Sequence, residues 1–130
     1  MQVRLPARSA QHACLGFIRA LNAADLVTAT ACFSREACLI TPDATAVRGR
    51  QGIGAVLAQL IARRLEIRVE ASHLLAAGDV TMARERWMVR SNGVEGSRLE
   101  QALSATLVLR LIEGEWKLAI VAPWGGGNGR

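Results

Sequence analysis

The spacing of apolar residues changes at Glu66, and this change constrains the fold more than any other feature of the chain. Before Glu66, apolar residues recur at the three- and four-residue intervals of helices with one buried face. After it, Ile67, Val69 and Ala71 alternate with charged residues, as in a strand with one solvated face. The pattern therefore predicts helices first and an antiparallel sheet second, which is an α+β fold.

Three helices are expected in the first half of the chain. They cover Ser9–Asn22, Asp25–Phe33 and about Gln51–Arg64. Asp25 is the predicted N-cap of the second helix, because its side chain can accept a hydrogen bond from the first helical turn. Short strand fragments are expected at Cys38–Ile40 and Val47–Arg48, on either side of a turn at Thr41–Asp43.

Four main antiparallel strands are expected in the order of the chain. They begin at Glu66, Val80, Arg98 and Trp116, and the last of them extends to Trp124. Residues 125–130 include four glycines, so this tail is predicted to be mobile rather than packed. With 130 residues and 51% hydrophobic content, we expect a single domain with its core at about residues 9–124.

The sequence also indicates where the protein is located. The longest uncharged apolar run, Gln51–Ala62, is shorter than the roughly 18 residues that a membrane span needs, so no membrane segment is expected. The first eight residues carry two arginines and no apolar stretch, unlike a secretory signal. Cys14, Cys32 and Cys38 are odd in number and lack a C-x-x-C spacing, which predicts free thiols and a cytoplasmic protein.

The net charge of +5 raises the question of nucleic-acid binding. The arginines are spread from Arg4 to Arg130, several lie beside acids, and the chain has no tyrosine, so a basic patch with stacking aromatics is not expected. Two histidines without nearby ligands predict no metal site. Gly49–Gly54 does not have the glycine spacing of a dinucleotide-binding loop, so no cofactor is expected.

Four short motifs resemble the nuclear transport factor 2-like superfamily, and its SnoaL-like and ketosteroid-isomerase-like branches most of all. The motifs are Phe17–Leu26, Val47–Ile53, Ala77–Val80 and Glu115–Leu118, and the resemblance covers about Ser9–Trp124. It implies a cystatin-like fold, in which a cone-shaped, curved antiparallel sheet packs on three N-terminal helices around a cavity. The superfamily contains several kinds of enzyme and also association domains without catalysis, so the fold alone does not choose a function.

The residues that carry ketosteroid isomerisation in the resembled family are replaced in this chain. The resemblance places Phe17 at the position of a tyrosine donor, Thr41 at the position of the aspartate base and Leu107 at about the position of a second acid. None of these side chains supplies the base or the donors that an enolate needs, so steroid isomerase activity is not expected. We expect the three to line a ligand pocket instead, together with Trp87 and Trp124.

Three other residues are candidates for acid–base chemistry. If Glu85 faces the helices with Trp87, apolar surroundings favour its protonated form and suit it to proton transfer; in the other register it lies on the surface beside an arginine. Asp43 lies close to the position of the family's base, and alternatively only starts a turn. His73 can carry protons to and from Glu85 if both side chains lie on the same face of the sheet, which requires a hairpin turn one residue longer than Gly78–Asp79. With the two-residue turn, His73 is a non-catalytic histidine.

These observations predict a small-molecule enzyme or binder with an apolar pocket and without a metal. The chemistry implied by the resemblance is of the isomerase, cyclase or hydrolase type, and whether the protein is an enzyme is left open. The expected partners are an apolar or weakly acidic small molecule and a second copy of the chain in a homodimer. The alternative is a non-catalytic dimerisation or ligand-sensing module.

Overall fold

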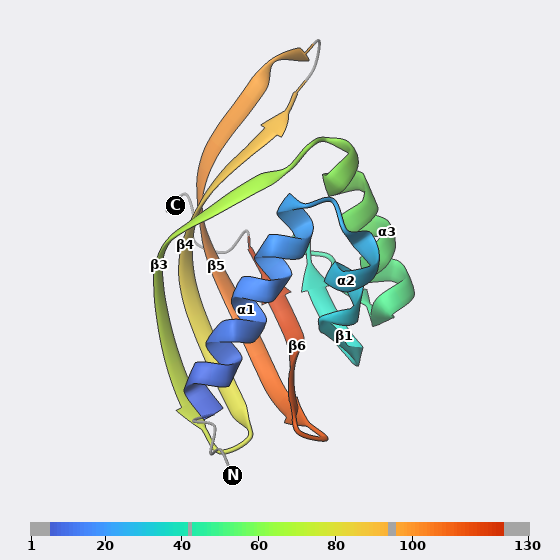
Figure 1. Ribbon diagram of the computed structural model, residues 1–130. Helices are drawn as coiled ribbons and strands as arrows, with labels where there is room; N and C mark the ends of the chain where they lie inside the picture. The colour runs from blue at the N-terminus through green and yellow to red at the C-terminus, as the bar shows by residue number, and fades with distance from the viewer. Residues whose placement is uncertain (1–5, 42, 94–95, 124–130) are drawn as a thin grey trace.

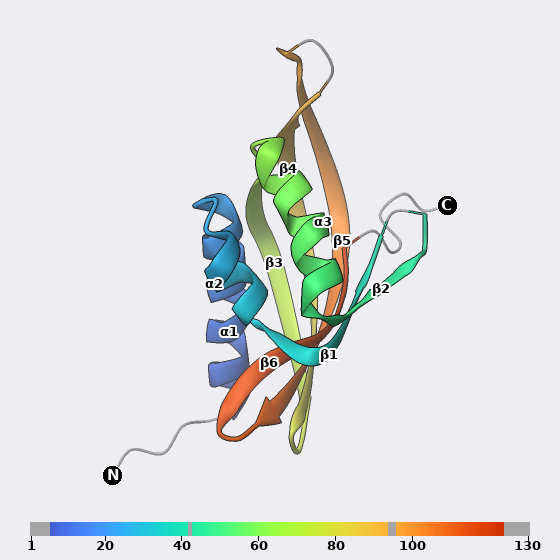
Figure 2. The same cartoon turned by 90° about the vertical axis from the view of Figure 1, so that its right-hand side faces the viewer.

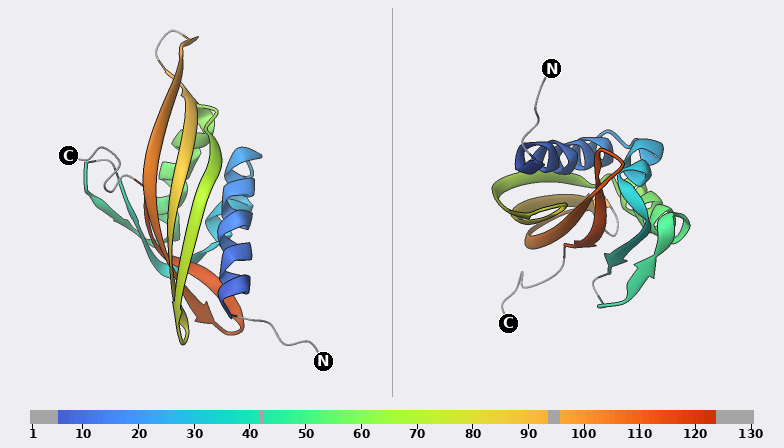
Figure 3. Two further views of the ribbon diagram at one scale, coloured as in Figure 1. Left: turned by 90° about the vertical axis from the view of Figure 1, so that its left-hand side faces the viewer. Right: turned by 90° about the horizontal axis from the view of Figure 1, so that it is seen from below.

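A computed structural model describes residues 6–41, 43–93 and 96–123 of the chain. Its elements in chain order are α1 (Pro6–Asn22), α2 (Leu26–Ala31), β1 (Phe33–Ile40), β2 (Ala46–Arg48), α3 (Gly49–Ala62), β3 (Glu66–Ala77), β4 (Val80–Asn92), β5 (Arg98–Ile112) and β6 (Glu115–Ala122). The long strands curve around α1, which lies across them in Figure 1. Seen from below in Figure 3, the sheet curves on one side and the helices close the other. This architecture confirms the expected α+β fold class.

The six strands form one sheet in the order β2-β1-β6-β5-β4-β3. The four long strands β3 to β6 are antiparallel neighbours in chain order, as the sequence predicts. The sheet is not antiparallel throughout, however, because β1 runs parallel to β6, with Leu39 opposite Val121. The expectation of a purely antiparallel sheet is therefore corrected to a mixed sheet.

The boundary between α2 and β1 differs from the sequence prediction. The helix ends at Ala31 instead of Phe33, and the strand begins at Phe33 instead of Cys38. The carbonyl of Cys32 accepts a hydrogen bond from the N–H of Leu118 at 2.8 Å, which draws the chain into the sheet beside β6. Phe33 is then fully buried, with its ring edge-to-face against Phe17 at 5.2 Å between centroids. Tertiary packing therefore overrides the apolar spacing that predicted a longer helix.

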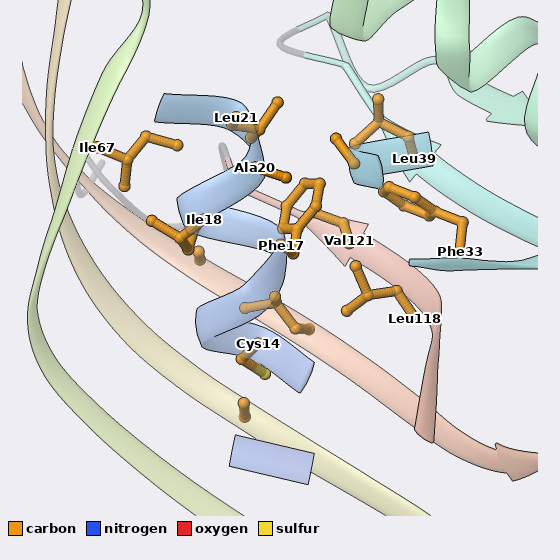
Figure 4. Close-up of a cluster of buried hydrophobic side chains, with 14 of the residues drawn as sticks. Cys14, Phe17, Ile18, Ala20, Leu21, Phe33, Leu39, Ile67, Leu118 and Val121 are labelled. Atoms are coloured by element: carbon orange, nitrogen blue, oxygen red, sulfur yellow. The ribbon is translucent and has the colours of Figure 1, made fainter. Parts of the chain in front are cut away.

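The core forms where one face of α1 meets the inner face of the sheet. Figure 4 shows Phe17, Ile18 and Leu21 of α1 among apolar side chains from β1, β3 and β6. The side chain of Asn22 fixes the end of this helix to β3: its amide donates to the carbonyl of Ile67 and its oxygen accepts from the Ile67 N–H, both at 2.8 Å. In the described part of the chain, every helix is too short or too polar to cross a bilayer.

Some sequence expectations fall on parts of the chain that lie outside the described residues. These are the side chain of Trp124, the glycine-rich tail at 125–130 and Pro42 of the predicted turn. The expectations for them stay predictions.

Candidate functional site

A cavity of about 690 Å³ lies between α3, the loop after β1 and the inner face of the sheet. Figure 2 shows this arrangement, with α3 in front of the long strands and the β1–β2 segment beside it. The inner wall of the cavity is apolar and buried, and is formed by Phe17, Leu21, Trp87, Leu103 and Val121 among others. Small-molecule sites commonly have volumes of about 300 to 1,000 Å³ and apolar walls of this kind.

Polar side chains lie at the rim of this cavity and not at its inner wall. They are Thr41, Asp43, Thr45, Gln59, Arg63, Ser91 and Gln101, all exposed or half-buried. One part of the rim is formed where α3 ends against β4, since the carbonyl of Arg63 accepts a hydrogen bond from the N–H of Asn92 at 2.8 Å. The cavity can therefore surround an apolar ligand while polar groups at the entrance contact its end.

Asp43 lies on the loop after β1 and is the only carboxylate among the described residues that line the large cavity. Its Oδ1 accepts hydrogen bonds from the hydroxyl of Thr41 and, at 3.3 Å, from the N–H of Thr45. These hydrogen bonds lower the pKa of Asp43 below its ordinary value, and the one from Thr41 has the largest effect. Asp43 thus organises the loop, which is the alternative role that the sequence left open, and its ionised form is a weak base.

Glu85 faces the helices, because the buried residues of β4 are Thr81, Ala83, Glu85, Trp87 and Val89. Its side chain is 6% exposed. Two donors hold the carboxylate: Nε1 of Trp87 donates to one oxygen at 2.8 Å, and the hydroxyl of Ser72 donates to the other at 3.2 Å. The structure thus gives Glu85 the inward register and excludes the surface pairing with an arginine.

Glu85 does not line the large cavity. It lies at a separate, smaller cavity of about 260 Å³ between α1 and β3, which Gln11, Leu15 and Ser72 also line. A β-bulge in β3 lies beside this smaller cavity, since the pairing of β3 with β4 shifts by one residue at Glu70. Because Trp87 lines the large cavity and its indole N–H donates to Glu85, the hydrogen bond connects this carboxylate to the wall of the large cavity.

The thiol of Cys14, on α1, lies in the same buried region. Burial, and to a smaller extent the negative charge of Glu85, raise its pKa to about 12. A thiol in this state stays protonated at neutral pH and acts as a small apolar side chain.

The other candidate residues lie in different places. Phe17, Thr41 and Trp87 line the large cavity, as the sequence predicts. Leu107 is fully buried but is not among the lining residues, so its predicted place in the pocket wall is wrong. His73 is exposed and opposite Arg84, because the hairpin turn has two residues, so it belongs to neither cavity.

Five polar residues of the rim were not predicted from the sequence: Thr45, Gln59, Arg63, Ser91 and Gln101. Gln59 and Arg63 are four residues apart near the end of a predicted helix, so they lie on one helix face. Their common position could have been predicted from the sequence. Ser91 and Gln101 lie on the inner faces of β4 and β5, because side chains alternate between the two faces of a strand. The pairing of Ser91 with Leu99 determines which residues of β5 share the inner face with those of β4. Among the described residues, no three histidine, cysteine, aspartate or glutamate side chains gather as a metal site requires.

In a comparison with protein families, the model of the SnoaL-like domain matches residues 15–119. This chain belongs to the SnoaL-like domain family. No curated protein matches the sequence significantly.

Solved structures support the same assignment at the level of the fold. A proposed dehydratase of the nuclear transport factor 2-like family from Streptomyces avermitilis is 18% identical, with a TM-score of 0.79 over 91% of this chain and 95% of that chain. A ketosteroid isomerase-like protein from Erwinia carotovora atroseptica is 16% identical, with a TM-score of 0.79 over 92% and 95%. A proposed calcium/calmodulin-dependent protein kinase type II association domain from Thiobacillus denitrificans is 23% identical, with a TM-score of 0.71 over 87% and 93%.

Proposed function

We propose that this SnoaL-like protein binds an apolar or weakly acidic small molecule in the large cavity. The observation that carries the proposal is that apolar and polar side chains occupy different parts of that cavity. The buried inner wall is apolar, and the polar groups lie at the rim. Such a site removes the body of an apolar ligand from water, at about 25 cal/mol for each Å² buried. A few polar groups then fix its orientation.

Acid–base chemistry of the isomerase, cyclase or hydrolase type remains part of this proposal. Asp43 is the group that reaches the ligand directly, and its lowered pKa limits its strength as a base. Glu85 acts instead as a positioning residue, because it holds the indole of Trp87 in the cavity wall. Steroid isomerisation is not proposed, since Phe17 and Thr41 supply neither an oxyanion donor of the required acidity nor a base.

Binding is tested with the neutral, apolar fluorophore N-phenyl-1-naphthylamine, whose emission rises in apolar surroundings. Val56 lines the cavity from α3, whereas Ala55 is exposed on the same helix. Val56→Trp fills part of the cavity and should weaken the affinity at least tenfold, which corresponds to about 1.4 kcal/mol. Ala55→Trp adds the same ring outside the cavity and should leave the affinity within twofold. Equal affinities for both variants and the wild type would show that the fluorophore binds elsewhere.

A second function, dimerisation, is favoured by the outer face of the sheet. One row of paired residues crosses five strands and is apolar throughout: Leu75, Met82, Val108, Ile120 and Cys38. Leu75 is 67% exposed and Ile120 is 40% exposed, so the row is open to a partner. We propose that a second copy of the chain covers it in a homodimer, because an isologous contact pairs such a row with itself.

The homodimer is tested by light scattering at tens of micromolar. The wild type should have the mass of two chains, and Ile120→Lys should have the mass of one, because a buried unpaired charge at the interface is unfavourable. Val27→Lys places the same charge on α2 at a residue that is 80% exposed, and should leave the dimer intact. A monomeric wild type would contradict the proposal.

We also propose that the protein is cytoplasmic. All three cysteines are free, and free thiols persist in a reducing compartment.

A further inference from the structure

The rim of the large cavity carries a cation that has no anionic partner among the described residues. Arg63 lines the cavity from the end of α3, and among the described residues no carboxylate lies within 4 Å of its guanidinium. An arginine at the entrance of an apolar cavity, with no ion pair of its own, is available to a ligand.

Two acidic residues of the sheet, Glu66 and Glu100, have arginine partners other than Arg63. Glu66, at the start of β3, lies 3.9 Å from Arg90 and 3.6 Å from Arg98, and Glu100 accepts from Arg90 at 3.2 Å. These carboxylates pair with arginines of β4 and β5 and not with Arg63.

Asp43 is the other charged group at the rim, and it is also engaged. Its Oδ1 accepts from Thr41 and Thr45 within its own loop, and these hydrogen bonds stabilise its negative charge there. Within the part of the chain that the structure describes, the Arg63 side chain has no such partner, and the polar residues that line the cavity with it include Gln59, Ser91 and Gln101. Each of these side chains can donate a hydrogen bond to an oxygen of the ligand.

We propose that the ligand of the large cavity is an amphipathic anion, with an apolar body against the inner wall and one carboxylate or similar oxyanion bound by Arg63. The inference rests on the proposed ligand-binding function and narrows the class of ligand. The planar guanidinium forms two parallel hydrogen bonds to an oxyanion, which positions the charged end at the rim. The apolar body then extends toward Trp87 and Leu103, which carry no charge.

Two fluorophores that differ by a single charged group test this inference. One is neutral N-phenyl-1-naphthylamine, and the other is 8-anilino-1-naphthalenesulfonate, which has the same rings and one sulfonate. Arg63→Gln should weaken binding of the sulfonate by about three- to tenfold, the range for a charged contact at a partly exposed site, and leave the neutral probe within twofold. Arg63→Lys should retain most of the affinity for the sulfonate. The control is Arg64→Gln, which removes the same charge one residue away and outside the cavity lining.

The two probes also separate the possible failures. Unchanged binding of the neutral probe by Arg63→Gln shows that the variant is folded and that its cavity is intact. If Arg63→Gln weakens both probes equally, or Arg64→Gln has the same effect as Arg63→Gln, the inference is wrong and the proposed function stands. If neither probe binds the wild type, the proposed function is wrong and this inference falls with it.

Discussion

The side chain of Trp87 links the two cavities of the molecule. Its ring forms part of the apolar wall of the large cavity, and its Nε1 donates to the carboxylate of Glu85 at 2.8 Å. The hydrogen bond fixes the plane of the indole, because Glu85 is itself held by Ser72. The shape of the large cavity therefore depends on a carboxylate that does not line it.

Removing the indole N–H should destabilise the protein more than removing the ring area alone. Trp87→Phe leaves one oxygen of Glu85 without its donor, and hydrogen bonds to charged groups contribute about 1.5 to 3 kcal/mol. Trp116→Phe is the matched control, since Trp116 is also buried and its indole N–H donates to none of the described residues. Urea unfolding should show a larger loss for Trp87→Phe by at least about 1 kcal/mol. Equal losses would mean that the hydrogen bond adds no stability.

The thiol of Cys14 should make the protein less stable at alkaline pH. The folded-state pKa is about 12, against an ordinary value of 9.0, so between these values the unfolded chain releases the thiol proton and the folded chain keeps it. Stability should fall as pH rises through this window, by at most about 1.4 kcal/mol per pH unit. The chain has no tyrosine, and Lys117 is its only lysine, so few other groups titrate there.

Unfolding free energies measured from pH 8 to pH 11 check this prediction. Cys14→Ala should show a shallower decline than the wild type. Parallel curves for the two proteins would contradict the raised pKa of Cys14.

Individual strands and helices were predicted where one face is clearly polar. The alternation after Glu66 identified β3, and a hairpin turn to β4 was predicted, but its length stayed open until the structure showed the two-residue turn Gly78–Asp79. The inward face of β4 could not be chosen, because Met82 and Met88 make its outer face as apolar as its inner face. The bulge at Glu70 leaves no mark in the sequence, since it depends on how two strands pair.

Two glycine substitutions should change the stability in opposite directions. Gly78 begins the β3–β4 turn with φ +64°, a conformation that an L side chain adopts only with strain, so Gly78→Ala should destabilise the protein by about 1 kcal/mol. Gly16 lies within α1, and a Cβ added there meets nothing within 4 Å. Gly16→Ala should therefore stabilise the helix by about 0.5 to 1 kcal/mol. Thermal unfolding of both variants checks the signs, and a stabilised Gly78→Ala would refute the assigned turn.

At the scale of the whole molecule, the change of period and four short motifs were enough to predict the fold. The site was only partly predictable, because its rim joins α3, β4 and β5 through contacts distant in sequence, such as that between Arg63 and Asn92. The parallel pairing of β1 with β6 was missed for a similar reason. The pairing of β1 with β6 changes its register across residues 34–37, and the largely polar sequence of this segment resembles that of a loop.

The central claim is that the large cavity, and not another surface, holds the ligand. Methyl NMR of the protein titrated with N-phenyl-1-naphthylamine tests it most directly. We expect the largest shifts and intermolecular contacts at methyls of the inner wall, such as Leu57, Leu103 and Val121, with the outer-face methyls of Leu75 and Ile120 unaffected. Contacts at Leu75 and Ile120, with an unperturbed inner wall, would contradict the account.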